Sequence, residues 1–377
     1  MTTIKLPSFR RKLPIGTIIL FLLFLLGVYA AVVRLVNGFS VGTNLSDLRP
    51  WGIWISFDLL VGVAISSGAF VLAATVHIFH LKKYNPILRP ALLTGFLGYL
   101  LVILALLVDL GQPQRIWHML VYRNLHSPLF EVGMCVMAYT MVLFIEFSPP
   151  LLEKLGWYEP LKALQKISLP VVILGVVLST MHQSSLGSLF LIVPYRMHPL
   201  WYTSLLPLIF LVYAIAVGFG MVIIEYVVSH RFLGGEVRPG ILRGLGKGLL
   251  GTLIILLLVK VGDLLNAGEL GLILENSLQG KMFLLENVVG IILPIGLLLI
   301  SRRRGNIKWV FRAGVLAVMG LVLHRFNLSL IGMAGAAYTP HWLEIALTVG
   351  LFSGGILVFG LALKHLPLDG HEVPMNS

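Results

Sequence analysis

The chain has 377 residues, of which 58% are hydrophobic and only 12% are charged, and its mean hydropathy is +0.94. A soluble domain carries about 25% charged residues, so this composition excludes an ordinary soluble enzyme and predicts an integral membrane protein. The formal net charge of +12 does not indicate a nucleic-acid partner, because the basic residues alternate between loops as in membrane proteins. The single cysteine, Cys135, excludes a disulfide framework and a cysteine-ligated metal cluster.

Ten apolar segments are long enough to cross a bilayer as helices. Each one approaches or exceeds the ~20 residues that cross ~30 Å of hydrocarbon. The sequence therefore predicts an all-α, polytopic transmembrane bundle that forms one integral membrane domain over residues 1–377. In chain order, we expect helices at residues 14–36, 53–80, 88–110, 127–147, 163–187, 199–229, 241–264, 279–301, 308–330 and 341–364.

The ten predicted helices divide into two similar halves. Helices 2–5 form one expected four-helix bundle at about residues 51–190, and helices 6–9 form a second at about 199–330. The first and tenth helices flank these bundles.

The distribution of basic residues predicts the orientation. Twenty of the 28 Lys and Arg residues fall on the side of the membrane that carries the N-terminus, six fall on the other side, and Lys260 and Arg325 lie within helices. Positive residues concentrate on the cytoplasmic side of membrane proteins. We therefore expect both termini in the cytoplasm, in agreement with the even number of helices, and a bacterial inner membrane as the location.

Several ionisable residues fall inside these helices. At about 1.5 Å per residue, Asp58 lies two turns below the outer surface, Glu131 and His182 lie about one turn below it, Tyr99 lies near the middle, and Glu225 lies near the inner end. An ionisable group at mid-depth costs about 3 kcal/mol on insertion scales, so it usually faces the bundle interior and has a task or a partner. This band of residues predicts a pocket that opens toward the outer face.

Other polar residues have simpler interpretations. Asp109, Asp263 and Arg325 lie within about one turn of a helix end, where side chains can reach the interface, and Glu146 near an inner end is expected to be interfacial. Lys260 has two possible partners, Asp263 or Glu286, and such a pair would hold helices together.

Three kinds of function fit such a pocket. A quinone site needs donors for two carbonyls, a proton source and an apolar groove, and His, Asp, Glu and Tyr among Leu and Ile supply them. A b-type haem needs paired axial histidines, and His182 and His324 are the nearest candidates. Buried carboxylates also suit a proton or ion carrier. The chain has no P-loop or cysteine-rich iron–sulfur run, so electrons must come from another subunit.

Six segments resemble one known family. The chain is similar to the NrfD-like, or polysulfide-reductase-like, integral membrane subunits, and most of all to the HybB type, the membrane subunit of quinone-linked nickel–iron hydrogenase. The segments are RPWGIWISFDLLVG (49–62), RPALLTGFLGYLLV (89–102), HSPLFEVGMCVMAYT (126–140), TMHQSSLGSLF (180–190), HPLWYTSLLPL (198–208) and HRFNLSL (324–330).

The resemblance implies a role in electron transport. It implies a chain without haem or iron–sulfur cluster that binds menaquinone or ubiquinone near the periplasmic face, with possible proton translocation. The implied partners are a periplasmic ferredoxin-like iron–sulfur subunit and the small and large subunits of a nickel–iron hydrogenase. Members of the family also serve molybdenum reductases, so another respiratory oxidoreductase stays open as an alternative.

The matching motifs assign roles to individual residues. They imply that Asp58, His182 and Glu131 bind quinone in a pocket walled by helices 2–5, and that Tyr99, Glu131, His182 and Glu225 form a proton path. No metal ligand is expected, and the chain alone is expected to be non-catalytic.

Overall fold

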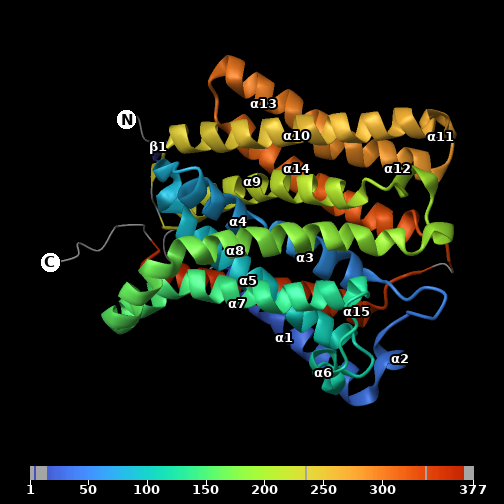
Figure 1. Ribbon diagram of the computed structural model, residues 1–377, viewed down its shortest axis with the longest axis horizontal. Coiled ribbons are helices and arrows are strands. Elements are labelled where there is room, and N and C mark those ends of the chain that lie inside the picture. The colour runs from blue at the N-terminus through green and yellow to red at the C-terminus, as the bar shows by residue number, and fades with distance from the viewer. Residues whose placement is uncertain (1–3, 6–14, 234–235, 336–337, 369–377) are drawn as a thin grey trace.

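The computed structural model describes residues 4–5, 15–233, 236–335 and 338–368 (Figure 1). Ten helices in this part of the chain are long and apolar enough to cross a membrane, which confirms the predicted fold class. The uninterrupted spans are α1 (Ile15–Asn37), α5 (Asn85–Asp109), α7 (Pro128–Leu155), α8 (Tyr158–Leu191), α9 (Leu206–Leu233), α10 (Pro239–Ala267) and α15 (Trp342–His365).

Three spans contain π-helical segments. The second span consists of π-helical Trp54–Leu59, α3 (Leu60–Ile65), α4 (Gly68–Ala73) and π-helical Ala74–Ile78. The eighth span consists of α12 (Leu278–Asn287), π-helical Val288–Ile292 and α13 (Leu293–Arg304). The ninth span consists of α14 (Lys308–Phe326) and π-helical Asn327–Ile331. Such insertions are rare and concentrate at functional sites.

Short elements complete the connections. They are β1 (Ile4–Lys5) and β2 (Glu236–Val237), which pair antiparallel, α2 (Phe39–Gly42), α6 (His118–Val121), α11 (Leu270–Leu274), and 3-10 turns at Lys82–Tyr84, Pro113–Arg115, Pro194–Arg196 and Pro199–Trp201.

The spans pack as two bundles flanked by one helix pair (Figure 1). The second span, α5, α7 and α8 form the first bundle, and α9, α10, α13 and α14 belong to the second. The second span and α8 both contact α9, and the second span is almost completely buried between the bundles. The pair α1 and α15 packs beside α5.

Glycines allow close helix contact at two points. A Cβ on Gly27 of α1 would lie 2.6 Å from the Cα of Gly350 on α15, and a Cβ on Gly320 of α14 would lie 1.9 Å from the Cα of Gly290 in the eighth span. Small residues let helix backbones approach closely in membranes, where packing drives association.

Both described ends of the chain lie at one end of the bundle. The N-terminal strand β1 pairs with β2, just before α10 begins, and the Arg89 guanidinium at the start of α5 donates to the backbone oxygen of Pro367 at 2.8 Å. We call this end the inner end and the opposite end the outer end, following the predicted orientation.

Some helix boundaries differ from those expected. The fourth helix continues through Pro149 and Pro150 to Leu155, and α8 begins three residues later, because Gly156 ends α7 in the left-handed conformation (φ 71°). The sixth span begins at Leu206 rather than 199, because Pro199–Trp201 forms a 3-10 turn.

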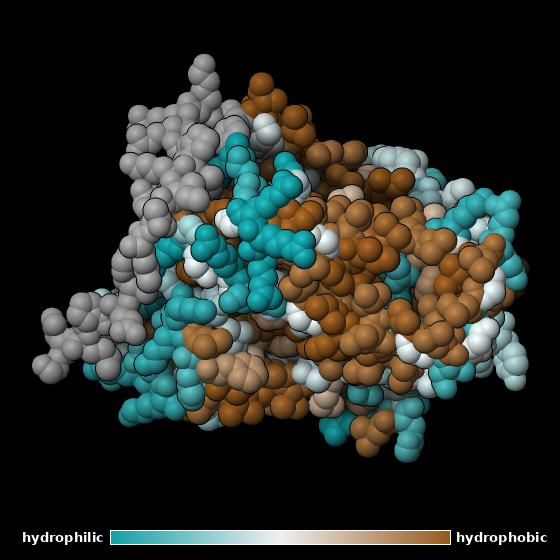
Figure 2. Space-filling model, turned by 90° about the horizontal axis from the view of Figure 1, so that it is seen from above, coloured by the Kyte–Doolittle hydropathy of each residue, from teal (hydrophilic) through white to brown (hydrophobic). Residues whose placement is uncertain are grey.

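The surface agrees with a multi-pass membrane protein. Figure 2 shows apolar side chains over the middle of one face and hydrophilic residues toward both ends. Large apolar residues such as Leu22, Phe144 and Leu258 are exposed on the spans. Because water would penalise this much exposed apolar surface, lipid is the surrounding that fits it.

Candidate functional site

A cavity of about 310 Å³ lies where the second span, α5, α9 and α15 meet. Its wall is almost entirely apolar and includes Leu97, Leu101 and Phe352. Two carboxylic acids, Asp58 and Glu225, also line it. Asp58 lies near the outer end of the second span and Glu225 near the inner end of α9, so the cavity is an apolar groove that extends along the spans.

Asp58 is the buried polar group at the outer part of this groove. Its side chain is 3% exposed, and its Oδ2 accepts a hydrogen bond from the Thr348 hydroxyl at 2.8 Å. Its Oδ1 has no partner among the described residues. Buried polar atoms are nearly always hydrogen-bonded, so an unpaired oxygen on a residue that lines the groove points to a missing partner, such as a bound ligand. Asp58 belongs to the π-helical segment Trp54–Leu59.

Glu225 has a similar environment at the other part of the groove. It is buried, and its Oε1 has no partner among the described residues. Thr94 lines the groove beside it. The structure therefore places Asp58 and Glu225 in one cavity, although the sequence-based prediction gave them separate roles.

His182 and Tyr99 lie elsewhere, in the core of the first bundle. His182 is fully buried, and its ring centroid is 5.8 Å from that of Tyr99, which is 4.8 Å from that of Tyr139. Neither ring nitrogen of His182 has a partner in the described chain. His182 does not line the groove. The pocket with Asp58 is walled by the second span, α5, α9 and α15, and not by helices 2–5 as expected.

Glu131 lies at the outer surface. It is exposed in the first turn of α7 and accepts a hydrogen bond from the buried Ser185 hydroxyl at 2.6 Å. A carboxylate at this position also interacts favourably with the positive end of the helix dipole. Glu131 does not line the groove, and its predicted role in quinone binding stays a prediction.

The second bundle contains a carboxylate that is fully paired. Glu286 accepts hydrogen bonds from Lys260 Nζ at 3.0 Å and Asn327 Nδ2 at 2.7 Å, and it contacts Nδ1 of His324 at 3.1 Å. Trp201 Nε1 donates to it at 3.2 Å. Of the two partners considered for Lys260, Glu286 is confirmed. This network connects four separate segments of the chain.

Arg325 lies beside this network and is fully buried, so it does not reach the interface. Its guanidinium carbon is 3.3 Å from the centroid of the Phe210 ring. The ring face partly compensates the cation.

A second polar network at the outer end was not recognised from the sequence. Glu344 accepts hydrogen bonds from the backbone amides of Asn44 and His341 and from the Tyr338 hydroxyl, which in turn accepts from the amide of Ile53. Burial and the hydrogen bond to Glu344 raise the pKa of Tyr338 above its ordinary range. The network fastens the start of α15 to the loop that precedes the second span.

The contribution of α15 to the groove was also missed. Thr348, Phe352 and Gly355 are spaced one turn apart and face the groove or its carboxylate. In an apolar helix these residue types are typical of packing positions. The sequence offers no signal that brings Thr348 next to Asp58, 290 positions away.

Comparisons with known proteins give the family. Residues 41–336 match the family described as Polysulphide reductase, NrfD. A protein of Nitratidesulfovibrio vulgaris is 38% identical over 366 residues, covering 94% of each chain. The Probable Ni/Fe-hydrogenase 2 b-type cytochrome subunit of Escherichia coli is 34% identical over 89% of this chain and 88% of its own length. The Menaquinone reductase, integral membrane subunit, of N. vulgaris is 28% identical over 94% and 92%. The chain belongs to the NrfD family of integral membrane proteins.

Proposed function

We propose that this chain is the quinone-reactive membrane subunit of a respiratory oxidoreductase complex. It would pass electrons from an iron–sulfur subunit at the outer face to menaquinone or ubiquinone in the membrane. The observation that carries the proposal is the groove of about 310 Å³, in which Asp58 presents a buried, unpaired carboxyl oxygen. Family membership supports it.

The groove has the chemistry that a quinone requires. A lipid-soluble quinone needs an apolar channel for its isoprenoid tail and a few polar groups that orient its head group. Leu97, Leu101 and Phe359 supply apolar wall, and Asp58 supplies the polar group. A bound quinone accepts two electrons and two protons and becomes the quinol.

Asp58 would both orient the head group and hold a proton for it. The Thr348 hydroxyl donates to Oδ2, which leaves Oδ1 as the carboxyl oxygen without a partner among the described residues. Proton transfer by a positioned side chain contributes about 10²–10⁴-fold to a rate. The apolar walls exclude bulk water, which strengthens these polar interactions.

The remaining predicted residues have less direct support in the geometry. Tyr99 and His182 are adjacent in the core of the first bundle and suit a proton path there. Glu225 borders the inner part of the groove, and Glu131 faces the outer surface. We retain Glu131 as a proposed contact, either for the quinone head group or for the partner subunit.

Hydrogen oxidation is the favoured source of electrons. The relative from E. coli is named as a nickel–iron hydrogenase subunit, so we propose a ferredoxin-like iron–sulfur subunit and the hydrogenase small and large subunits as partners. Oxidation of H2 releases two protons and two electrons, and the electrons cross the iron–sulfur subunit to the groove. The chain would hold no haem or iron–sulfur cluster, and it would lie in a bacterial cytoplasmic membrane with both termini inside.

A second candidate is the same role in another complex of the family, such as a molybdenum reductase. It is favoured by the likeness to a menaquinone reductase subunit.

The experiment compares Asp58→Asn with Asp109→Asn in the purified complex. Asp109 is also an outer-end carboxylic acid with a buried, unpaired oxygen, but it does not line the groove. We expect Asp58→Asn to lower hydrogen-dependent reduction of a menaquinone analogue by about 10² or more, with hydrogen-dependent dye reduction unchanged, and Asp109→Asn to match the wild type. Wild-type quinone reduction by Asp58→Asn would overturn the assignment of the groove.

A further inference from the structure

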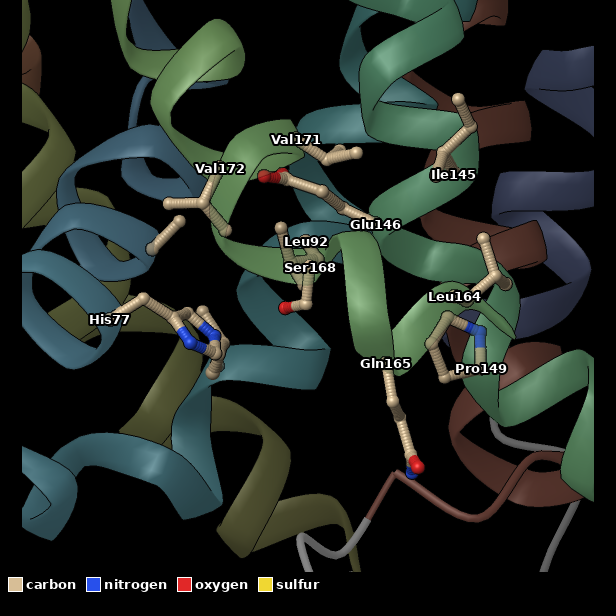
Figure 3. Close-up of a pocket in the computed structure, with 12 residues that line it drawn as sticks. His77, Leu92, Ile145, Glu146, Pro149, Leu164, Gln165, Ser168, Val171 and Val172 are labelled. Carbon is tan, nitrogen blue, oxygen red and sulfur yellow. The ribbon is translucent and has the colours of Figure 1, made fainter. Parts of the chain in front are cut away.

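A second cavity, of about 90 Å³, lies inside the first bundle near its inner end. Figure 3 shows the polar side chains that line it. The Glu146 carboxyl from α7 and the Ser168 hydroxyl from α8 point into the same space as the His77 ring from the second span, and the Gln165 amide points away from them. None of these residues belongs to the groove described above.

The polar side chains that line this cavity differ in exposure, from Gln165 at one side to Glu146 at the other. Gln165 is exposed, and Ser168 and His77 are half-buried. Glu146 is half-buried too, but its Oε1 is shielded from solvent and has no hydrogen-bond partner among the described residues. A water needs about 10–15 Å³ of such space and two or more polar partners. The cavity therefore has room and polar partners for several waters between Glu146 and the exposed Gln165.

A glycine leaves space between this cavity and the bundle core. A Cβ built on Gly175 of α8 would lie 3.4 Å from Glu146 Oε1, 3.1 Å from Val142 Cγ1 and 3.7 Å from Cε2 of the Tyr139 ring. Glu146 and the Tyr139 ring therefore both lie next to Gly175. Ser179, one turn further along α8, is fully buried and faces the same core.

Beyond Gly175, the core contains a column of buried polar atoms that lack partners in the described chain. They are the hydroxyl oxygens of Tyr139, Ser179 and Tyr99 and both ring nitrogens of His182. The rings follow one another, with centroids 4.8 Å apart for Tyr139 and Tyr99 and 5.8 Å apart for Tyr99 and His182. A buried polar group left unpaired costs about 1–3 kcal/mol. So many in one column mark a chain of groups that gain hydrogen bonds only when water enters the bundle or the side chains turn.

The outer end of the column approaches the groove. Gln183, next to His182, donates to the backbone oxygen of Val63 in the second span at 3.2 Å. Gly62, adjacent to Val63, lines the groove that contains Asp58. The column and the groove are therefore separated by the backbone of the second span at this level.

We propose that the inner cavity is a water-filled inlet, and that Glu146 takes up protons there and passes them along the column of buried polar groups to His182. His77 lies across the inlet and orients its water. The inference rests on the proposed function only for the destination of the protons, the quinone site. Each reduction would take up two protons from the inner side for two electrons that arrive from the outer side. Glu146, and not Glu225, is then the inner end of the path.

Cysteine labelling tests the inlet without any quinone activity. The full-length chain in membrane vesicles would carry Cys135→Ala, so that a single introduced thiol is read. Ser168→Cys places this thiol in the inlet, and Ser229→Cys is the control, since Ser229 is buried near the inner end of α9 and lines neither cavity. The probe is a charged, membrane-impermeant methanethiosulfonate.

We expect Ser168→Cys to react when the probe is added at the inner side and not at the outer side, and Ser229→Cys to stay unlabelled. Labelling of Ser168→Cys only by a lipid-soluble maleimide would mean that the cavity opens to lipid, and it would overturn the inlet.

A second experiment tests Glu146 as the proton-uptake group. In the complex reconstituted into vesicles, Glu146→Gln should slow quinone reduction by about 10² and remove proton uptake from the inner compartment. The control is Glu159→Gln, an exposed carboxylate near the start of α8 that lines neither cavity, and it should keep both. Full rate and full inner proton uptake in Glu146→Gln would overturn the relay. The two proposals can be distinguished. If Asp58→Asn loses quinone reduction while Glu146→Gln behaves like the wild type, the quinone site is supported and only the proton path is wrong.

Discussion

The Glu286 network of the second bundle and the column of Tyr139, Tyr99 and His182 in the first bundle differ in how their buried polar groups are paired. In the second bundle, Glu286 is saturated by donors from Lys260, Asn327 and Trp201 and by contact with His324. In the first bundle, the hydroxyl oxygens of Tyr99 and Tyr139 and the ring nitrogens of His182 have no partner in the described residues. The guanidinium nitrogens of Arg325, beside the Glu286 network, also lack hydrogen-bond partners there, but this cation lies over the Phe210 ring.

This difference distinguishes polar groups that stabilise the fold from polar groups that can bind water or a ligand. A buried ion pair that is fully hydrogen-bonded holds its helices in one arrangement. Unpaired groups beside a cavity can instead exchange partners with water or ligand. The comparison predicts that substitutions in the Glu286 network act on stability, whereas those in the column and the groove act on activity.

The largest effect on stability is expected when the network around Glu286 is broken. Glu286→Ala leaves Lys260 buried without its counterion, which typically costs about 3–5 kcal/mol. We expect the variant to lose most of its thermal stability in detergent, measured as the temperature at which the monodisperse protein disappears. Glu159→Ala, an exposed carboxylate, is the control. A wild-type melting temperature for Glu286→Ala would contradict the structural role.

The outer network at Glu344 should show the next largest effect. Tyr338→Phe removes a hydrogen bond to a carboxylate, worth about 2 kcal/mol, and leaves the Ile53 amide unpaired. Because the pKa of Tyr338 in the folded protein is raised above the ordinary value of 10.0, the neutral hydroxyl contributes its full stability below that ordinary value, and the contribution is lost as the pH rises through the raised pKa.

The pH dependence of this variant checks the bond. The difference in unfolding free energy between wild type and Tyr338→Phe should stay constant from about pH 6 to about pH 10, where a tyrosine in the unfolded chain begins to ionise, and it should fall only at higher pH. A difference that disappears near neutral pH would argue against the bond.

A third variant tests the groove through its shape. Gly355→Leu projects a side chain into the space beside Leu101, since a Cβ there already lies 2.6 Å from Leu101 Cδ1. We expect the KM for a menaquinone analogue to rise about 10-fold, or about 1.4 kcal/mol. Gly360→Leu on the same helix points into open space and should leave KM unchanged. Equal KM values for the two variants would show that the groove does not hold the quinone.

The smallest effect is expected at the surface. Lys162 and Glu159 form an exposed ion pair at 3.2 Å near the start of α8. Exposed pairs of this kind contribute below about 0.5 kcal/mol. The melting temperature of Lys162→Ala should therefore equal that of the wild type within error. A decrease as large as that of Tyr338→Phe would show that an exposed ion pair stabilises this protein as much as a buried hydrogen bond does.

The sequence predicted the spans well because hydropathy acts locally. Ten long apolar runs, the Lys260–Glu286 pair as one of two options, and Asp58 as a buried acid all follow from residue type and depth. The walls of the sites did not follow, because they depend on how distant helices rotate against each other. Thr348 meets Asp58 across 290 positions, and Glu146 resembled an interfacial carboxylate until α8 and the second span were seen to enclose it.

The most direct test of the central claim is to locate the bound quinone. A photoreactive menaquinone analogue would be activated in the purified complex, and the labelled peptides would be identified by mass spectrometry. We expect labels on α5 and α15 around Leu101 and Phe352, competed away by unlabelled menaquinone and lost in Asp58→Asn. Labels confined to α7 and α8, with the groove peptides unmodified, would contradict the proposed site.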